Sequence, residues 1–248
     1  MGSPAWRVTH RETHMKRLVL ALAATAIVLG TGCGSPPCQR NVTLDWSGGF
    51  LGADGVQRPC ASASAAGVAF VDLFINNDAT TAARFSCTAY AAQAVDVGSG
   101  TNLYTVEGVE SGGRIAFRAE LSVAAACGNQ TFAVAPAEGT LALDYSLPGN
   151  ACFAPDSRIF SEVRDDIANQ IAFVDSSTSS PLCAPSPAPA PTYLLPAGNF
   201  TLIGVNEFSQ SSGGVVGADC TLRAFQIVGG TSVTTVSPAI VNSTRACF

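Results

Sequence analysis

The sequence predicts an all-β protein, built from two tandem antiparallel β-sandwich domains that follow an N-terminal leader. Three observations predict this fold: short strand-like segments bounded by turn residues, an internal duplication, and eight widely spaced cysteines after Cys33. The remaining length suits two domains of about 100 residues each. The 248 residues divide into a leader at 1–32, a linker at 33–40, a first sandwich at 41–140 and a second sandwich at 141–248.

Strand-like segments fill both halves of the chain after the leader. Most run for about six to ten residues, a usual strand length, and they are rich in Val, Ile, Phe, Thr and Tyr. Gly, Pro, Asn or Asp separates most of them. We expect strands in the segments 42–47, 66–75, 83–90, 102–109, 114–123, 130–135 and 140–146, and again within 193–208, 225–230 and 231–241.

The stretch from 157 to 174 is ambiguous. Its apolar residues recur at every fourth position, which suits one face of a helix as well as two strands. The matching part of the first copy has the pattern of strands, so we expect strands here too. The four residues are Ile159, Val163, Ile167 and Ile171.

An internal duplication supports the division into two copies. The motif LDWS at 44–47 returns as LDYS at 143–146, and four further landmarks follow in the same order in both copies. A shared order of this kind indicates tandem copies of one domain. The landmarks are Cys60 and Cys152, Cys87 and Cys183, the segments LYTVEGV from Leu103 and NFTLIGV from Asn199, and the glycine pairs that begin at Gly112 and Gly213.

The leader has the three parts of an export signal. A basic start at Met15-Lys16-Arg17 precedes an apolar run at 18–29, which is too short to cross a bilayer as a helix. Small residues at 30–32 then lead directly to Cys33. We interpret Met15 as the true start, and residues 1–14 as an extension. Ordinary secretion, with cleavage near Gly32 or Gly34, is the alternative.

This stretch resembles the lipobox of bacterial lipoproteins, although Gly30 stands where that motif usually has leucine. The resemblance implies that the thiol of Cys33 carries lipid and that Cys33 becomes the mature N-terminus. Two or more acyl chains would hold the protein stably on a membrane. Gly34-Ser35 resembles the outer-membrane sorting pattern, so we expect an outer-membrane lipoprotein. A secreted or periplasmic protein is the alternative.

The composition after the leader excludes several classes of function. From Cys33 onward the chain has no His, Lys or Met, and nine arginines against seventeen acidic residues leave a formal charge of −8. Such a chain offers no basic stripe for nucleic acid. It has no imidazole base, no His-ligated metal and no lysine for a Schiff base. We therefore expect no cofactor, no metal and no catalytic residue. Carboxylate chemistry, or oxygen ligands for calcium, would remain available.

The cysteines predict disulfide bonds. None forms a CxxC pair, and eight remain when Cys33 is reserved for lipid, an even set that is typical of exported proteins. Equivalent positions in the two copies should form equivalent bonds, so we pair Cys60 with Cys87 and Cys152 with Cys183. For the other four, the more local choice keeps each bond inside one copy, and other pairings stay open. That choice joins Cys38 to Cys127 and Cys220 to Cys247.

The second copy contains a family-like motif. A Leu-Pro-x-Gly turn, Leu195 to Gly198, leads into a strand of aromatic-Thr-aliphatic type, Phe200-Thr201-Leu202. This resembles the carboxypeptidase-regulatory-like, or transthyretin-like, β-sandwich domains. The resemblance implies an antiparallel seven-strand sandwich in each copy, without catalytic residues. The first copy keeps Gly100, Tyr104, Thr105 and Val106 but lacks the Leu-Pro.

Three sets of residues have both a structural and a functional interpretation. Trp46 and Tyr145, at matched positions, fit a sandwich core better than a ligand-stacking role. Asp165-Asp166 and the segment 76–78 fit turns or strand ends better than calcium ligands, because no 12-residue loop with alternating ligands accompanies them. The matched acids Asp45 and Asp144 indicate a shared structural role, with a paired catalytic site as the alternative.

Two classes of function follow from these observations. We expect a non-catalytic exported lipoprotein that acts as a binding or structural module of the cell envelope. Its expected partners are a membrane, through Cys33, and an envelope protein or glycan. The alternatives are a carboxylate-dependent polysaccharide-active enzyme and a calcium-dependent carbohydrate-binding module. Two acids about 5 to 10 Å apart in one cleft would favour the enzyme. We expect a binding surface at the loop ends, 48–58 or 176–191.

Overall fold

The computed structural model describes residues 38–60, 67–95, 97–174, 182–183 and 190–248. The leader and Cys33 therefore lie outside the described residues. Within the described part, the regular elements are β-strands, apart from two short 3-10 turns, Cys87–Ala89 and Pro148–Asn150. The predicted all-β fold class is confirmed.

Among the residues that the structure describes, no helix has the length and apolar character needed to cross a membrane.

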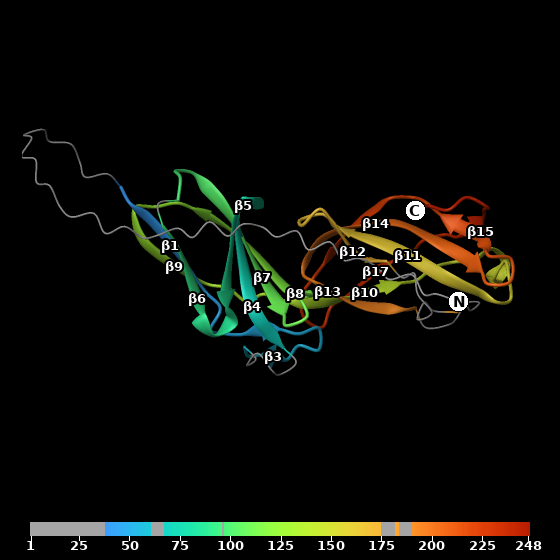
Figure 1. The fold of residues 1–248 in the computed structure, drawn as a ribbon, viewed down its shortest axis with the longest axis horizontal. Coiled ribbons are helices and arrows are strands. Elements are labelled where there is room, and N and C mark those ends of the chain that lie inside the picture. The colour runs from blue at the N-terminus through green and yellow to red at the C-terminus, as the bar shows by residue number, and fades with distance from the viewer. Residues whose placement is uncertain (1–37, 61–66, 96, 175–181, 184–189) are drawn as a thin grey trace, which may run out of the picture. The chain divides into compact units, whose positions relative to one another are not determined.

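The first copy is a sandwich of two sheets (Figure 1). The smaller sheet has the strand order β6-β1-β9, and the larger sheet has the order β5-β4-β7-β8. A small hairpin, β2-β3, lies between β1 and β4 in the chain. The strands are β1 (Arg40–Asp45), β2 (Phe50–Leu51), β3 (Gln57–Arg58), β4 (Val68–Ile75), β5 (Asp78–Ser86), β6 (Ala91–Val95), β7 (Thr101–Glu110), β8 (Ile115–Ala124) and β9 (Gly128–Ala133).

The second copy repeats this plan, in yellow to red in Figure 1. Its smaller sheet, β13-β10-β17, has the same pattern of partners as β6-β1-β9. In its larger sheet, β12-β11-β14-β15-β18, strand β14 pairs with both β15 and β16, where the first copy has the single strand β8. The strands are β10 (Glu138–Leu143), β11 (Ser157–Asp165), β12 (Gln170–Val174), β13 (Thr192–Pro196), β14 (Gly198–Ser209), β15 (Gly214–Asp219), β16 (Arg223–Ile227), β17 (Val233–Val236) and β18 (Val241–Asn242).

One strand pair in each copy departs from the antiparallel pattern. β1 pairs parallel with β9, and β10 pairs parallel with β17, while the other pairs of named strands are antiparallel. In both copies a late strand, β9 or β17, follows a strand of the larger sheet and lies beside the first strand, in the same direction; in the second copy β18 then returns to the larger sheet. A parallel pair needs such a long crossover and cannot be joined by a hairpin turn.

Each copy has its own hydrophobic core between its two sheets. Strand alternation turns Val42 and Leu44 of β1 inward, and Val71 and Leu73 of β4 meet them from the other sheet. Trp46 is fully buried, and its indole Nε1 donates a hydrogen bond to the Cys87 carbonyl at 2.9 Å. The predicted core role of Trp46 is confirmed.

In the second core, Tyr145 takes the position that Trp46 has in the first. Tyr145 is only partly buried, where it packs against the cluster that contains Leu141, Leu143 and Phe200. Its place beside the core fits the structural interpretation, although the ring does not reach the depth of Trp46.

The ambiguous stretch 157–174 forms the antiparallel strands β11 and β12, as the duplication predicted. Buried and half-buried residues alternate along β11, and Ile159 and Val163 both point into the core. A spacing of four residues is even, so it places side chains on one face of a strand as readily as on one face of a helix. Here the segment 157–165 pairs antiparallel with the neighbouring strand β14, and this pairing favours the strand.

Four disulfide bonds join the eight described cysteines, and each bond lies within one copy. Two of these pairs are those expected from the duplicated spacing, and the other two are those that the more local choice gave. Peptide mapping under non-reducing conditions is the experimental test of all four. Each bond closes a long loop of the unfolded chain, which should stabilise the fold by about 3 to 4 kcal/mol. The pairs are Cys38–Cys127, Cys60–Cys87, Cys152–Cys183 and Cys220–Cys247.

Candidate functional site

A row of charged side chains crosses the outer face of the first copy's larger sheet. Arg84 of β5 is paired with Asp72 of β4, Asp72 with Glu107 of β7, and Glu107 with Arg118 of β8. These four residues, which we call the charged row, face away from the core because their chain neighbours, such as Val71 and Val106, face into it. Two acids are adjacent in the middle of the row, and an arginine stands at each end.

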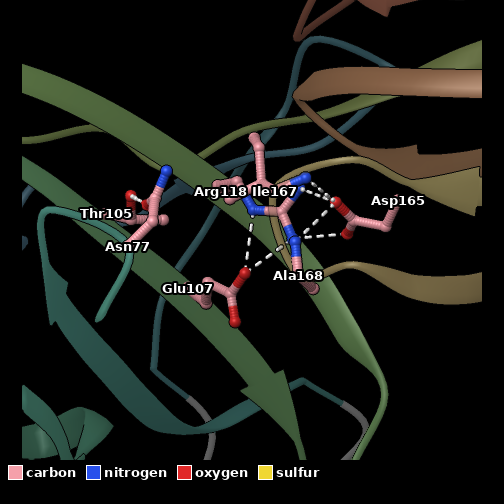
Figure 2. A network of polar contacts seen from close by, with 7 residues as sticks. All are labelled: Asn77, Thr105, Glu107, Arg118, Asp165, Ile167 and Ala168. Atoms are coloured by element: carbon pink, nitrogen blue, oxygen red, sulfur yellow. Dashed lines mark hydrogen bonds and ion pairs between the residues drawn. The ribbon is translucent and has the colours of Figure 1, made fainter. Parts of the chain in front are cut away.

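Arg118 closes the buried end of the row. Its side chain is 0% exposed, although it projects from the outer face of a sheet. Its Nε and one terminal nitrogen donate to Glu107 Oε1 at 2.8 and 2.6 Å (Figure 2). The same guanidinium donates to both carboxylate oxygens of Asp165, at 3.2 and 2.6 Å. Asp165 ends β11, so one guanidinium joins the two copies.

The backbone around Arg118 supports this contact. The Arg118 amide donates to the Ala137 carbonyl at 3.0 Å, and the Ala137 amide donates back to Arg118 at 2.9 Å. Asp165 Oδ1 also accepts from the amides of Ile167 and Ala168, which fixes the carboxylate within its turn. Gly198 lies against the guanidinium, and a Cβ atom there would come within 3.1 Å of an Arg118 nitrogen.

The electrostatics of the buried end follow from this geometry. Burial raises the pKa of Glu107 above its ordinary value, although the Arg118 guanidinium opposes that shift. Burial disfavours the charge on Arg118, but the bonds to Asp165 and Glu107 outweigh it and raise the pKa of Arg118. Both carboxylates bind the same cation, so neither is a free general acid or base.

The exposed end of the row is a second, separate ion pair. Arg84 donates from Nε and a terminal nitrogen to the two oxygens of Asp72, each at 2.7 Å. The bonds to Asp72 raise the pKa of Arg84. Its guanidinium also lies 5.4 Å from the centre of the Phe70 ring. This two-point contact holds a flexible side chain in one orientation.

A cleft opens over the charged row. It has a volume of about 280 Å³, near the lower end of small-molecule sites. The β11–β12 turn of the second copy forms one wall. We call this hollow the sheet-face cleft. Its polar lining is Asp72, Asn77, Arg84, Thr105, Glu107 and Gln170, and its apolar lining includes Phe74, Val109, Ile115 and Ile167.

A second hollow adjoins the sheet-face cleft. It has a volume of about 620 Å³ and extends along β12 and β13 of the second copy. The two hollows share part of their walls and are therefore neighbours. The shared residues are Gly113, Ile115, Ala168 and Gln170.

The residues considered for calcium serve the hairpin turns instead. Thr105 donates from Oγ1 to Asn77 Oδ1 at 2.7 Å, and the matched Thr201 donates to Asp166 Oδ2 at 2.7 Å. The two threonines are 96 positions apart, as the duplication requires. Each central strand thus closes the turn beside it with one hydroxyl. Asp165, the fifth candidate oxygen source, is bound by Arg118.

The matched acids Asp45 and Asp144 lie in different copies, at or just after the end of β1 and β10. Asp45 Oδ1 accepts from the Ser47 amide at 2.8 Å, and this bond lowers the pKa of Asp45. Asp144 is exposed. Equivalent positions in two separate sandwiches agree with the structural interpretation of this pair.

The two loops expected to bind have different outcomes. The loop 48–58 is tied to its own copy, where the Leu51 amide donates to the Pro136 carbonyl at 2.9 Å. It also reaches the second copy, because a Cβ atom on Gly230 would lie 3.3 Å from the Leu51 side chain. This loop, together with Arg118 and Asp165, therefore contributes to the contact between the two copies, which we call the joint. The loop 176–191 lies largely outside the described residues.

One group of described residues has the spacing of a metal site. Ligand atoms of Cys152, Cys183 and Glu207 lie within 4.8 Å of one another. The two cysteines are bonded to each other, so their sulfurs are not thiolate ligands. Glu207 Oε1 accepts from the amides of Phe153 and Ala154 and from the hydroxyl of Ser157. This carboxylate organises the chain beside the disulfide.

Sequence reasoning missed Glu107 and Arg118. Each is a single charged residue within an otherwise strand-like segment, and alternation places such a residue on the solvent side of a sheet. The alternation in the sequence predicts which face of the sheet Glu107 and Arg118 occupy, but it does not predict the residues with which they form ion pairs. Asp165 is 47 positions away from Arg118 and belongs to the other copy.

No protein-family model and no curated protein matches this chain. Several solved structures are distantly similar. The minor pilin of Streptococcus agalactiae matches over 84% of this chain and 98% of its own, with 11% identity and a TM-score of 0.31. The Bacillus anthracis TIE protein matches over 83% of this chain, with 10% identity and a TM-score of 0.30.

A leucine-rich repeat protein from Bacteroides thetaiotaomicron matches over 81% of this chain, with 11% identity and a TM-score of 0.28. This chain spans 26% of that protein's length and 34% of the length of the TIE protein. Matches at this level assign no family and no function.

Proposed function

We propose that this chain is an exported lipoprotein, anchored through Cys33, that acts as a non-catalytic structural and binding module of the cell envelope. The observation that carries the proposal is the Arg118 contact. The fully buried guanidinium of Arg118 forms ion pairs with one carboxylate from each sandwich, Glu107 and Asp165. These ion pairs hold the two copies in one arrangement at this point.

A fixed joint suits a module that spaces or presents a surface. If the two copies separated, Arg118, Glu107 and Asp165 would each need new partners in water, and the buried contact would be lost. Loop 48–58 adds a second close approach between the copies, because a Cβ atom on Gly55 would lie 3.0 Å from a methyl carbon of Thr231 in the second copy. The chain therefore resists bending between its two sandwiches.

The same contact opposes the enzyme alternative. Glu107 and Asp165 are the acids that approach each other across the joint, and Arg118 lies between them (Figure 2). A glycosidase needs one carboxyl that gives a proton and one that is free to attack or to activate water. Two carboxylates bound to one guanidinium meet neither requirement.

The anchor is tested by labelling the full chain in a Gram-negative host. We expect incorporation of labelled palmitate and partition into detergent, and we expect Cys33→Ala to abolish both. Ser35→Ala, two residues away, is the matched control and should keep the label. An unlabelled wild-type protein would contradict the anchor.

The non-catalytic assignment is tested with a panel of glycan and ester substrates. We expect no turnover above a heat-denatured sample. Turnover that Glu107→Gln removes while the variant keeps its wild-type circular dichroism would contradict the proposal and favour the carboxylate enzyme.

A further inference from the structure

We propose that the sheet-face cleft binds a neutral sugar chain, without calcium. This inference rests on the binding part of the proposed function and names its ligand class. It concerns the charged row, three of whose residues, Asp72, Arg84 and Glu107, line the cleft.

Glu107 supplies one carboxylate oxygen, Oε2, that is available to accept a hydrogen bond from a ligand. The residue is 3% exposed, and its Oε1 takes both bonds from Arg118. Within the described contacts, its Oε2 accepts no hydrogen bond, and Figure 2 shows this atom pointing away from the guanidinium. The residue also lines the cleft. Oε2 is not among the fully buried polar atoms without a partner, so it is reached from the cleft, and a ligand hydroxyl there can donate a charge-assisted hydrogen bond to it.

The other polar groups complete a surface for hydroxyl groups. Asp72 and Arg84 are held by their own two-point contact, so they present acceptors and donors in fixed positions. The amides of Asn77 and Gln170 line the same hollow and offer both kinds of group. A sugar ring carries hydroxyls that donate and accept at once, which matches this mixed lining.

Charge in the cleft excludes other ligand classes. Arg84 and Arg118 face Asp72, Glu107 and Asp165, so the charges nearly cancel and leave one negative charge. Phosphate or another polyanion requires an excess of positive groups, which the lining lacks. The apolar side chains of Phe74 and Ile115 offer contact to the C–H face of a sugar ring.

The strands beneath the cleft disfavour an extended peptide. Peptides that add to a sheet need an unpaired strand edge. β4 and β7 form the floor, and both are inner strands that are paired on each side. Ligand recognition must therefore use side chains. The neighbouring hollow of about 620 Å³ offers room for further units beside the cleft, which suits a chain of sugar units better than a single ring.

The test is affinity electrophoresis of the full chain in gels that contain dextran, laminarin, mannan or xylan. We expect at least one of these neutral polymers to retard the protein, and we expect retardation to persist in EDTA. Arg84→Gln should weaken binding at least tenfold, and Gln170→Ala several-fold. Both side chains are exposed, so both variants should fold.

Glu120→Gln is the matched control, because Glu120 is an exposed acid on β8 and does not line the cleft. It should bind as the wild type does. The inference is overturned if no neutral polymer retards the protein, or if Arg84→Gln is retarded as strongly as Glu120→Gln. It is also overturned if EDTA abolishes binding, or if only polygalacturonate or peptides bind. The palmitate label is independent of these results, so failure here leaves the anchor decided on its own evidence.

Discussion

At the residue scale, the side chains that matter most are polar groups that the fold has buried with their partners. The threonine pair shows how much of this the sequence contains. The duplication predicted that Thr105 and Thr201 are equivalent, and both close a hairpin turn through an Asx side chain. Their partners, Asn77 and Asp166, were visible only as turn residues. Position is encoded locally, whereas the hydrogen-bond partner depends on strand pairing.

Asp219 allows a test at this scale, because its side chain is 5% exposed and accepts three hydrogen bonds. Burial pushes its pKa upward, but the bonds from Arg223, Thr221 and Ala239 bring the pKa down to about 2. The folded carboxylate binds a proton less readily than the unfolded one. Its contribution to stability is therefore complete well above 3.8, the ordinary pKa of an aspartate, and is lost as the pH falls towards 2.

We expect Asp219→Asn to lower the free energy of unfolding at pH 7 by about 2 kcal/mol, as a pKa shift of this size implies. Near pH 2 the variant and the wild type should have nearly equal stability. Urea unfolding across this pH range measures the difference. The exposed Asp144→Asn is the control, and an unchanged gap between wild type and Asp219→Asn from pH 7 to pH 2 would refute the linkage.

At the scale of elements, strand existence was predictable and strand partnership was not. Alternation and turn residues gave β4, β7, β8 and β14, and the duplication gave β11 and β12. The parallel pairs β1–β9 and β10–β17 left no local signal, because they join strands at opposite ends of each copy. The division at 140 also falls inside β10, which spans Glu138–Leu143.

The Leu-Pro-x-Gly motif shows how an element start can acquire a second role. Gly100 and Gly198 stand just before and at the start of β7 and β14, both with positive φ, 111° and 144°. A Cβ at Gly100 would meet nothing within 4 Å. At Gly198 it would come within 2.8 Å of Ile167 and 3.1 Å of Arg118. The second copy's glycine therefore serves both a backbone conformation and the joint.

We expect Gly198→Ala to destabilise the protein by about 1 to 3 kcal/mol, because a side chain at this φ is strained and also presses on the buried guanidinium. Gly112→Ala is the control: its Cβ would meet nothing within 4 Å, and it should change stability by less than about 0.5 kcal/mol. Thermal unfolding followed by circular dichroism compares the two. Equal midpoints for both variants would show that Gly198 has no special role.

At the scale of the whole molecule, the two cores are separate but the joint is shared. The described residues from Cys38 to Phe248 form one compact unit that contains both hydrophobic clusters. Sequence analysis predicted two copies, and it treated them as independent domains on that basis. It could not predict the joint, because Arg118 and Asp165 lie in segments that each copy explains by itself. A repeated sequence pattern shows which residues are equivalent in the two copies, but it does not show which residues of one copy contact the other.

This joint predicts that both copies unfold together. Trp46 is the only tryptophan after the leader, so its fluorescence reports the first core. Hydrogen exchange of the β14 amides reports the second core. In the wild type we expect the two probes to give the same urea midpoint, as coincident transitions define one cooperative unit. Distinct wild-type midpoints would show that the copies are independent.

Arg118→Ala should separate the two transitions, because it leaves Glu107 and Asp165 buried without a cation, a change that typically costs about 3 to 5 kcal/mol. Arg84→Gln, at the exposed end of the charged row, is the control and should leave the midpoints together. The separation should shrink in mildly acidic solution, because burial already raises the pKa of Glu107 and a protonated carboxyl no longer needs the guanidinium. If Arg118→Ala keeps one transition at every pH, the cooperative link lies elsewhere, and the loop 48–58 becomes the next contact to test.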